Sequence, residues 1–353
     1  MTNNTRDIEI LHEIRNGDAK EQLRMIDEKF PREVFRGDFP VRTLKDNFHL
    51  RYNHFSRHAE SLLSQIADFR LSDKIKWFVG YETFEYPRCM FFPDSSCQIQ
   101  VSEKYFSYIW CATYCFFLHY EYQAQTNPED QTEDELLITS AMLKRAQQLF
   151  KWSRSLLHSS EGWDLSLPNP NPTSRMIDSE AIYCLYTNKI SINALVFILY
   201  HELGHSFYGR VYDIDDIKRY EQDADNFAVD LMKDPNEDNT FFSANFGIVV
   251  ALCSNLFLHP TPLKLSSDSH PDTDVRILNA IDRIVEKGEW AYKNYLNFVA
   301  IIFRMFGEIE TALITKSFIA NYNCYLFLKN ITTRRLYSLI SVVSPATHKT
   351  IRM

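Results

Sequence analysis

The chain has 353 residues, of which 45% are hydrophobic, and this length can bury one large core or two smaller ones. It contains only 9 glycines beside 26 phenylalanines and 19 tyrosines, a balance that favours packed helices over a glycine-rich barrel. The formal net charge of −8 argues against a general nucleic-acid-binding protein, because such proteins carry a basic face.

The N-terminal segment, residues 1–125, is expected to be helical with one β-hairpin. Its first part is charged and helix-prone, and its middle is rich in aromatic and β-branched residues. We interpret the whole segment as a possible module that recognises a partner or a trigger. The predicted elements are helices at 6–29 and 56–69, a hairpin at 77–101 and an apolar helix at about 103–122.

An acidic, proline-containing linker follows, and residues 134–310 are predicted to form the main folded core. The last segment, residues 311–353, contains basic but no acidic residues and is expected to pack on that core. The predicted fold is mainly α with a small β-sheet. The expected core elements begin with a helix at 135–158, an exposed non-helical loop at Pro168–Pro172 and a short strand at Glu180–Tyr186. The next expected helix has Ser191 as its N-cap and is apolar from Ala194 to Tyr200. A further helix is expected at about 213–233.

Three apolar runs are candidates for membrane-spanning helices. The longest uncharged run, residues 241–258, lies at the lower length limit for a spanning helix. The runs at 105–118 and 295–303 are shorter. We interpret all three as buried core helices and expect no stable membrane insertion.

The seven cysteines are odd in number and stand mostly among apolar residues. The polar start of the chain lacks the apolar stretch of a signal peptide. We therefore expect reduced thiols in a cytoplasmic protein. Cys111 and Cys115 have helical spacing, but no second pair follows at zinc-ribbon distance, which favours core packing for both.

The segment HELGH, residues 201–205, carries the strongest chemical signal in the chain. On a helix His201 and His205 share one face, and this spacing lets two imidazoles bind a single zinc ion. Glu202 is rotated off that face and can act as a general base on water. The apolar residues before the motif place these polar groups in the interior, where a metal ion would satisfy them.

Glu221 is the predicted third metal ligand. It falls on the apolar stripe of the next helix, between Ile217 and Ala224, and a carboxylate on such a stripe needs a partner. Asp225 stands one turn further on, where it could accept the second ring N–H of a ligand histidine. The alternative is a helix that merely borders solvent at Glu221.

The HExxH motif followed by E-Q-D-A-D at 221–225 resembles the gluzincin metallopeptidases. This resemblance implies a zincin-like core in which His201, His205 and Glu221 bind Zn2+ and Glu202 is the catalytic base. The metzincin pattern does not fit, because it requires glycine where Tyr208 stands and histidine at position 211.

His270, Pro271 and Arg276 fit an H-P-x-x-x-x-R element. This element resembles the HtpX-like and CAAX-prenyl endopeptidases and, more closely, the soluble Lit-type phage-exclusion peptidases. The resemblance implies that His270 stabilises the oxyanion and that Arg276 locks the local structure. The alternative for His270 is a loop histidine at a helix N-terminus, with Pro271 at the first helical position.

ImmA/IrrE-type regulatory peptidases form a third resemblance, because residues 221–231 also fit their pattern E-x-x-A-[ND]-x-F-A-x-x-L. These proteins are usually shorter before the motif. All the resemblances together cover residues 190–285, and the absence of clear membrane spans favours the Lit type.

The function predicted from these motifs is a zinc-dependent endopeptidase that cleaves a specific protein, with a triggered anti-phage or toxin-like protease as its candidate role. Its expected partners are the protein substrate and an activating partner or trigger, without nucleic acid. The substrate is expected to align along a sheet edge, with Glu180–Tyr186 as the candidate strand. The alternatives are a regulatory protease that acts on a repressor and a non-catalytic protein in which zinc only joins two helices.

Overall fold

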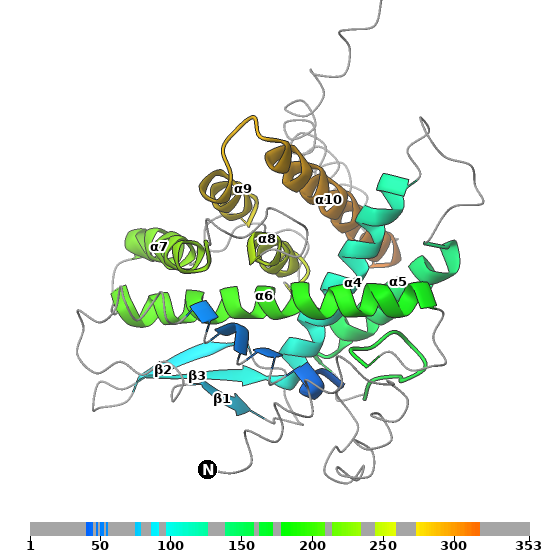
Figure 1. Cartoon of the computed structure of the whole chain (residues 1–353), viewed down its shortest axis with the longest axis horizontal. Helices are drawn as coiled ribbons and strands as arrows, with labels where there is room; N and C mark the ends of the chain where they lie inside the picture. Colours follow the sequence, from blue (N-terminus) through cyan, green and yellow to red (C-terminus); the bar gives the residue numbers. More distant parts are fainter. Residues whose placement is uncertain are drawn as a thin grey trace, which may run out of the picture.

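This computed structural model contains a long central helix with a small sheet on one side and four further helices on the other (Figure 1). The mainly α prediction is confirmed. The structure describes residues 40–44, 47–48, 50–52, 54–55, 75–78, 86–91, 97–125, 138–158, 162–171, 178–208, 214–233, 244–258 and 273–317. The helices predicted at 6–29 and 56–69 lie outside these residues, as does most of the C-terminal segment 311–353.

The sheet has three strands in the order β1-β3-β2. β2 (Arg88–Phe91) and β3 (Cys97–Ser102) are antiparallel, with Phe91 opposite Cys97, and together they form a hairpin. β1 (Ile75–Phe78) pairs parallel with β3, with Ile75 opposite Ile99. The hairpin is therefore shorter than the predicted range 77–101, whose beginning lies in a separate parallel strand.

The described chain begins with the short 3-10 helix η1 (Pro40–Leu44), which precedes the sheet. Helices α4 (Glu103–Gln125) and α5 (Ser140–Ser155) follow the sheet. α4 is buried from Tyr105 to Leu118, as expected for a core helix. Thr139 caps α5, because its hydroxyl accepts a hydrogen bond of 3.3 Å from the backbone N–H of Met142.

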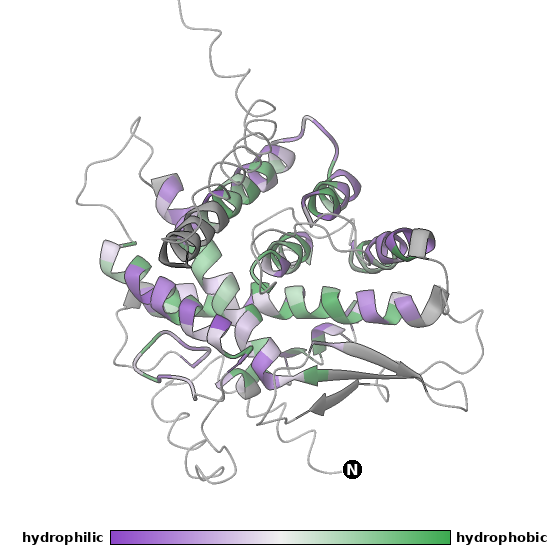
Figure 2. Ribbon diagram, turned by 180° about the vertical axis from the view of Figure 1, so that it is seen from behind, coloured by the Kyte–Doolittle hydropathy of each residue, from purple (hydrophilic) through white to green (hydrophobic). Residues whose placement is uncertain are grey.

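The central helix, α6 (Asp178–Tyr208), has 31 residues and contacts α4, the sheet, α7 (Ile214–Met232) and α8 (Ala244–Asn255). Its middle is hydrophobic, and hydrophilic residues follow at the end beside α7 (Figure 2). The apolar stretch Ala194–Tyr200 is buried, as predicted. α6 therefore carries the HELGH motif from the core outward.

Two predictions in this region are wrong because α6 begins earlier than expected. Glu180–Tyr186 is helical rather than a strand, and Ser191 lies in the helix interior, where its hydroxyl donates to the carbonyl of Asn188. No glycine or proline interrupts the chain between Asp178 and Leu203, so nothing local ends the helix.

Of the loop at Pro168–Pro172, the structure describes residues 168–171, which are non-helical, and residues 168–170 are buried rather than exposed. Its carbonyl groups find partners inside the protein: Trp163 donates to Pro168 and Asn188 donates to Pro170. The interior can hold this loop because its polar backbone is hydrogen-bonded.

Four helices complete the described chain: α7 and α8 contact α6 and each other, and α9 (Thr273–Ile284) contacts α7 and α8. α8 is buried along nearly its whole length, and most of the run at 295–303 is also buried, as expected for core helices. One hydrophobic cluster extends from Val41 to Met305. The division at residue 125 stays a prediction, although α4 shares this cluster. The helices are α7 (Ile214–Met232), α8 (Ala244–Asn255), α9 (Thr273–Ile284) and α10 (Trp290–Ser317).

One stretch of the described residues, Glu180–His205, is long and apolar enough by length and composition to cross a membrane. In this structure 72% of its most apolar window is buried inside the protein. A buried core helix passes the same test, so this feature alone is weak support for a membrane span.

Candidate metal centre

The last two turns of α6 present His201 and His205 on one face, because helical residues four positions apart lie above one another. His201 is buried and His205 is half-buried. Their Nε2 atoms are 3.1 Å apart. The HELGH motif therefore lies on a helix, as predicted.

Gly204 lets α7 approach this end of α6 closely. A Cβ atom added at Gly204 would lie 3.0 Å from the Cα and 3.2 Å from the Cβ of Ala224. These separations are tighter than ordinary van der Waals contact, so a side chain here would push the helices apart. Glu221 and Asp225, on either side of Ala224 along α7, can consequently reach the histidines.

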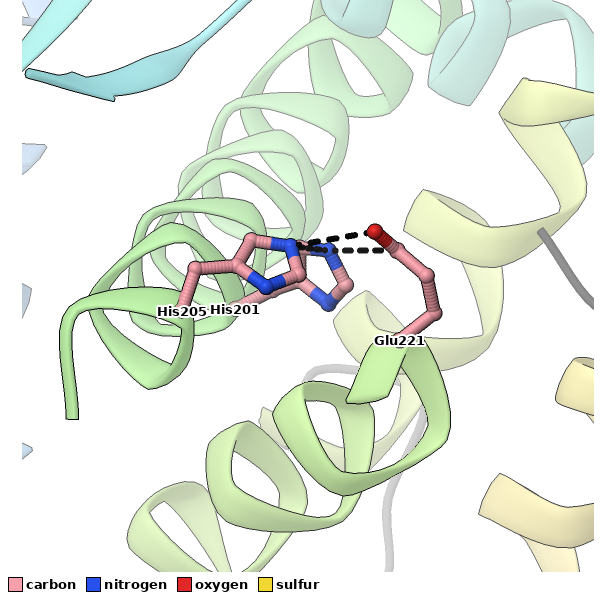
Figure 3. Close-up of side chains that lie close together, drawn as sticks. All are labelled: His201, His205 and Glu221. Carbon is pink, nitrogen blue, oxygen red and sulfur yellow. Dashed lines mark hydrogen bonds and ion pairs between the residues drawn. The ribbon is translucent and has the colours of Figure 1, made fainter. Parts of the chain in front are cut away.

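Glu221 completes a cluster of three donor atoms that point toward one another (Figure 3). Its Oε2 lies 3.3 Å from Nε2 of His201, and its Oε1 lies 3.4 Å from Nε2 of His205. Tetrahedral ligands at about 2.0–2.1 Å from zinc are themselves about 3.3 Å apart. The three side chains could therefore hold a metal ion.

Asp225 lies on the other side of His201. Its Oδ1 is 2.8 Å from Nδ1 of His201, the ring nitrogen that does not face Glu221. A proton on Nδ1 leaves the lone pair of Nε2 directed toward Glu221 and His205. Three converging acceptors repel one another in the buried site unless a cation lies among them.

In the metal-free protein, the pKa values of His201 and His205 also indicate that the cluster favours a positive charge. Burial lowers the pKa of His201, but Asp225 and Glu221 outweigh burial and raise that pKa to about 9. Burial and the neighbouring His201 lower the pKa of His205 to about 4. One proton is thus held at the cluster where a metal ion would bring two charges.

Arg276 of α9 anchors Asp225 through two short hydrogen bonds. Its Nε donates to Oδ2 at 2.6 Å and its Nη2 donates to Oδ1 at 2.7 Å. Both side chains are buried, and the guanidinium outweighs burial and holds the pKa of Asp225 well below its usual range. A continuous set of contacts therefore runs from α9 through α7 to His201 on α6.

Glu202 stands beside the cluster and is half-buried. Its charge acts on Tyr105, in the first turn of α4: burial raises the pKa of Tyr105, and the Glu202 carboxylate raises it further. Arg276 opposes this rise. Tyr105 is therefore a protonated phenol on the side of the site that α4 forms. Sequence reasoning missed it because it lies 97 positions before Glu202.

Tyr220 is a second residue that sequence reasoning missed. It precedes Glu221 on α7, its ring packs against the ring of His205, and its hydroxyl donates to the carbonyl of His205. Its position beside a predicted ligand was the only signal in the sequence.

The predicted oxyanion donor, His270, lies outside the described residues. The other predicted site residues, namely His201, Glu202, His205, Glu221, Asp225 and Arg276, lie at one end of α6, on α7, and on α9, which contacts α7.

Among the described residues, the charged groups that surround the cluster carry a net negative charge when His201 is neutral. Glu202, Glu221 and Asp225 contribute three carboxylates, and Arg276 contributes one guanidinium. All four groups interact with one another or with the histidines. A divalent cation would neutralise the excess.

Comparisons with known proteins agree with a peptidase. Neither the curated proteins nor the solved structures include a significant match. The model of one protein family, peptidase U49, matches residues 99–293, a range that contains every predicted site residue. Because this match covers more than half of the chain, the protein belongs to the peptidase U49 family.

Proposed function

We propose that this peptidase is a zinc-dependent endopeptidase of the gluzincin type, with His201, His205 and Glu221 as the metal ligands. The observation that carries the proposal is the convergence of three donor atoms at 3.1–3.4 Å from one another, with Glu202 next to the first ligand. Two imidazoles and a carboxylate are a donor set typical of catalytic zinc. The arrangement of α6 and α7 is consistent with a zincin-like core.

Bound zinc supplies Lewis acidity, which lowers the pKa of water toward neutrality and polarises a peptide carbonyl. Glu202 accepts the proton of the attacking water and delivers it to the leaving amine. Asp225 keeps a proton on Nδ1 of His201 and thereby leaves Nε2 as the ligand atom. Arg276 keeps Asp225 ionised and oriented.

His270 remains the proposed donor to the oxyanion. It stands three residues before Thr273, the first residue of α9. Arg276, in the first turn of that helix, bonds to Asp225 beside the proposed metal site. Tyr105 offers a second hydroxyl near Glu202.

The sheet edge that aligns the substrate is proposed to be β2. The earlier candidate, Glu180–Tyr186, is excluded because it is helical. β2 is an edge strand of the sheet and contacts α6, the helix that carries the zinc motif. An extended peptide added to this edge would gain main-chain hydrogen bonds beside the metal ligands.

We also propose a cytoplasmic protein that cleaves a specific protein after a trigger, as the likeness to Lit-type phage-exclusion peptidases suggests. The N-terminal segment, residues 1–125, would recognise the trigger or partner. The net charge of −8 supports a partner other than nucleic acid.

The test is substitution of Glu202 by glutamine. The variant should bind zinc as the wild type does, because Glu202 is not a ligand, but it should lose cleavage by a factor of at least about 100 without the base. Comparison of new protein termini in cells that express each form measures cleavage, and metal analysis of the purified chains measures zinc.

The matched control is Glu286→Gln, which makes the same change at an exposed position between α9 and α10. It should leave zinc content and cleavage unchanged. If wild-type protein contains zinc but neither form produces new termini and both have the same biological effect, the metal only joins α6 and α7. If wild-type protein binds no metal and cleaves nothing, the proposal fails.

A further inference from the structure

The two proposed histidine ligands differ in what holds their rings. Nδ1 of His201 lies 2.8 Å from a carboxylate oxygen of Asp225. Nδ1 of His205 is buried, and no group among the described residues hydrogen-bonds to it. Metal-binding histidines usually donate their second ring N–H to such a group, which fixes the ring orientation. Among the described residues, no carboxylate or carbonyl gives Nδ1 of His205 the contact that Asp225 makes with His201.

His205 also stands where a helix is weakest. α6 ends at Tyr208, and the last four carbonyl groups of a helix have no intrahelical donor. The carbonyl of His205 belongs to this group. Terminal turns open more easily than the middle of a helix, and here the opening would displace a metal ligand.

Tyr220 of α7 supports both the ring of His205 and the last turn of α6. Its hydroxyl donates a hydrogen bond to the carbonyl of His205, which ties the last turn of α6 to α7. Its ring lies over the imidazole of His205, with ring centroids 4.9 Å apart and an interplanar angle of 32°. The same residue thus holds both the backbone and the ring of His205.

We propose that Tyr220 is a positioning residue for His205, which holds the imidazole with Nε2 directed at Glu221 and at the metal. This inference rests on the proposed zinc site. Tyr220 and Glu221 are consecutive on α7, so one helix supplies both a ligand and the support of the neighbouring ligand. Tyr220 itself has no contact with the metal in this assignment.

Two substitutions separate the two contacts of Tyr220. Tyr220→Phe removes the hydrogen bond and keeps the ring, whereas Tyr220→Ala removes both. Loss of a group that orients a ligand typically lowers metal affinity by about 10–100-fold, which we expect for Tyr220→Ala. Tyr220→Phe should show a smaller loss, of about three- to tenfold, because the ring remains.

The measurements use the full chain, stripped with a chelator and titrated with zinc in competition with a chromophoric chelator. The visible spectrum of the cobalt form reports the ligand geometry, and the melting temperature of the metal-free form reports folding. Tyr292→Phe is the matched control, since it removes a hydrogen bond of 2.9 Å to Asp282 at an exposed site. It should change neither the zinc affinity nor the cobalt spectrum.

A graded loss of affinity from Tyr220→Phe to Tyr220→Ala, with a changed cobalt spectrum for Tyr220→Ala, supports the inference. Wild-type affinity and spectrum in both variants overturn it while the zinc site stands. Should Tyr220→Ala not fold, Tyr220→Phe decides by the same criteria. A wild-type chain that binds no zinc overturns both the inference and the proposed function.

Discussion

Asp225 and Asp230 both stand on α7, and each pairs with an arginine of α9, but solvent reaches them differently. The Asp225 and Arg276 side chains are 1% and 9% exposed, whereas the Asp230 and Arg283 side chains are 49% and 41% exposed. Water screens the second pair and not the first. Only the first pair touches a proposed ligand, His201.

We therefore predict that Asp225→Asn has two effects. It leaves the buried charge of Arg276 without its carboxylate, which should lower the free energy of unfolding by about 3 kcal/mol. It also weakens the support of His201, which should reduce zinc affinity by about 10–100-fold. Denaturant unfolding in the presence of a chelator and competitive zinc titration measure the two quantities.

Asp230→Asn is the control for that change, because it alters the same kind of pair between the same two helices. It should lower the free energy of unfolding by less than about 1 kcal/mol and leave zinc affinity unchanged. Equal effects of the two substitutions on zinc affinity would contradict the role of Asp225.

At the scale of elements, the site depends on how closely helices approach α6. Gly204 faces Ala224 of α7, and Gly247 of α8 faces Asn193 of α6. A Cβ atom at Gly247 would lie 2.4 Å from the Cβ of Asn193 and 2.8 Å from the nitrogen of Ala194. Glycine at both contacts keeps α7 and α8 against one helix, but only the first contact is next to the proposed metal ligands.

Gly204→Ala should reduce zinc affinity, because α7 must move away by a few tenths of an ångström and carry Glu221 with it. Stability should change little, since the gain in helix propensity of about 1 kcal/mol offsets part of the strain. Zinc titration and thermal unfolding test this combination.

Gly247→Ala provides the contrast. The clash with Asn193 and Ala194 should lower the free energy of unfolding by about 1–3 kcal/mol and leave zinc affinity unchanged in the folded protein. Unaltered zinc affinity in Gly204→Ala would show that the separation of α6 and α7 does not control the site.

At the scale of the whole molecule, the histidine cluster couples folding to pH. The pKa of His201 is about 9 in the metal-free fold and 6.5 ordinarily, so its contribution to stability is complete below pH 6.5 and is lost as the pH rises through 9. The pKa of His205 is about 4, so its contribution is present above pH 6.5 and is lost as the pH falls through 4. From these two groups, the metal-free protein should be most stable near pH 6.5.

Zinc should change this profile. Binding requires His201 to release the proton on Nε2, so the rise in melting temperature on adding zinc should grow from about pH 6 to about pH 8. Thermal unfolding with and without zinc across this range tests the prediction, and Glu202→Gln should follow the wild-type profile. A zinc-induced shift that is constant with pH would contradict the assignment of His201 as a ligand.

Local sequence patterns were sufficient to predict the position of a site residue where its residue type and the helical periodicity pointed to the same place. HELGH on an apolar helix predicted the placement of His201, Glu202 and His205, and the stripe on α7 predicted that Glu221 faces inward. The same patterns failed for Glu180–Tyr186, because a short run of aromatic and β-branched residues fits a strand or a buried helix equally well. The long burial of α6 decided between them.

The sequence by itself determined which residues can bind a metal, since imidazole and carboxylate groups at helical spacing require only local geometry. The tertiary structure decided how far apart they lie, because Gly204 and Ala224 set the distance between two helices whose contact is not encoded by spacing. It also decided that Arg276 anchors Asp225 and that Tyr220 supports His205. These pairings join different helices, and side-chain packing between helices brings together residues that the chain keeps apart.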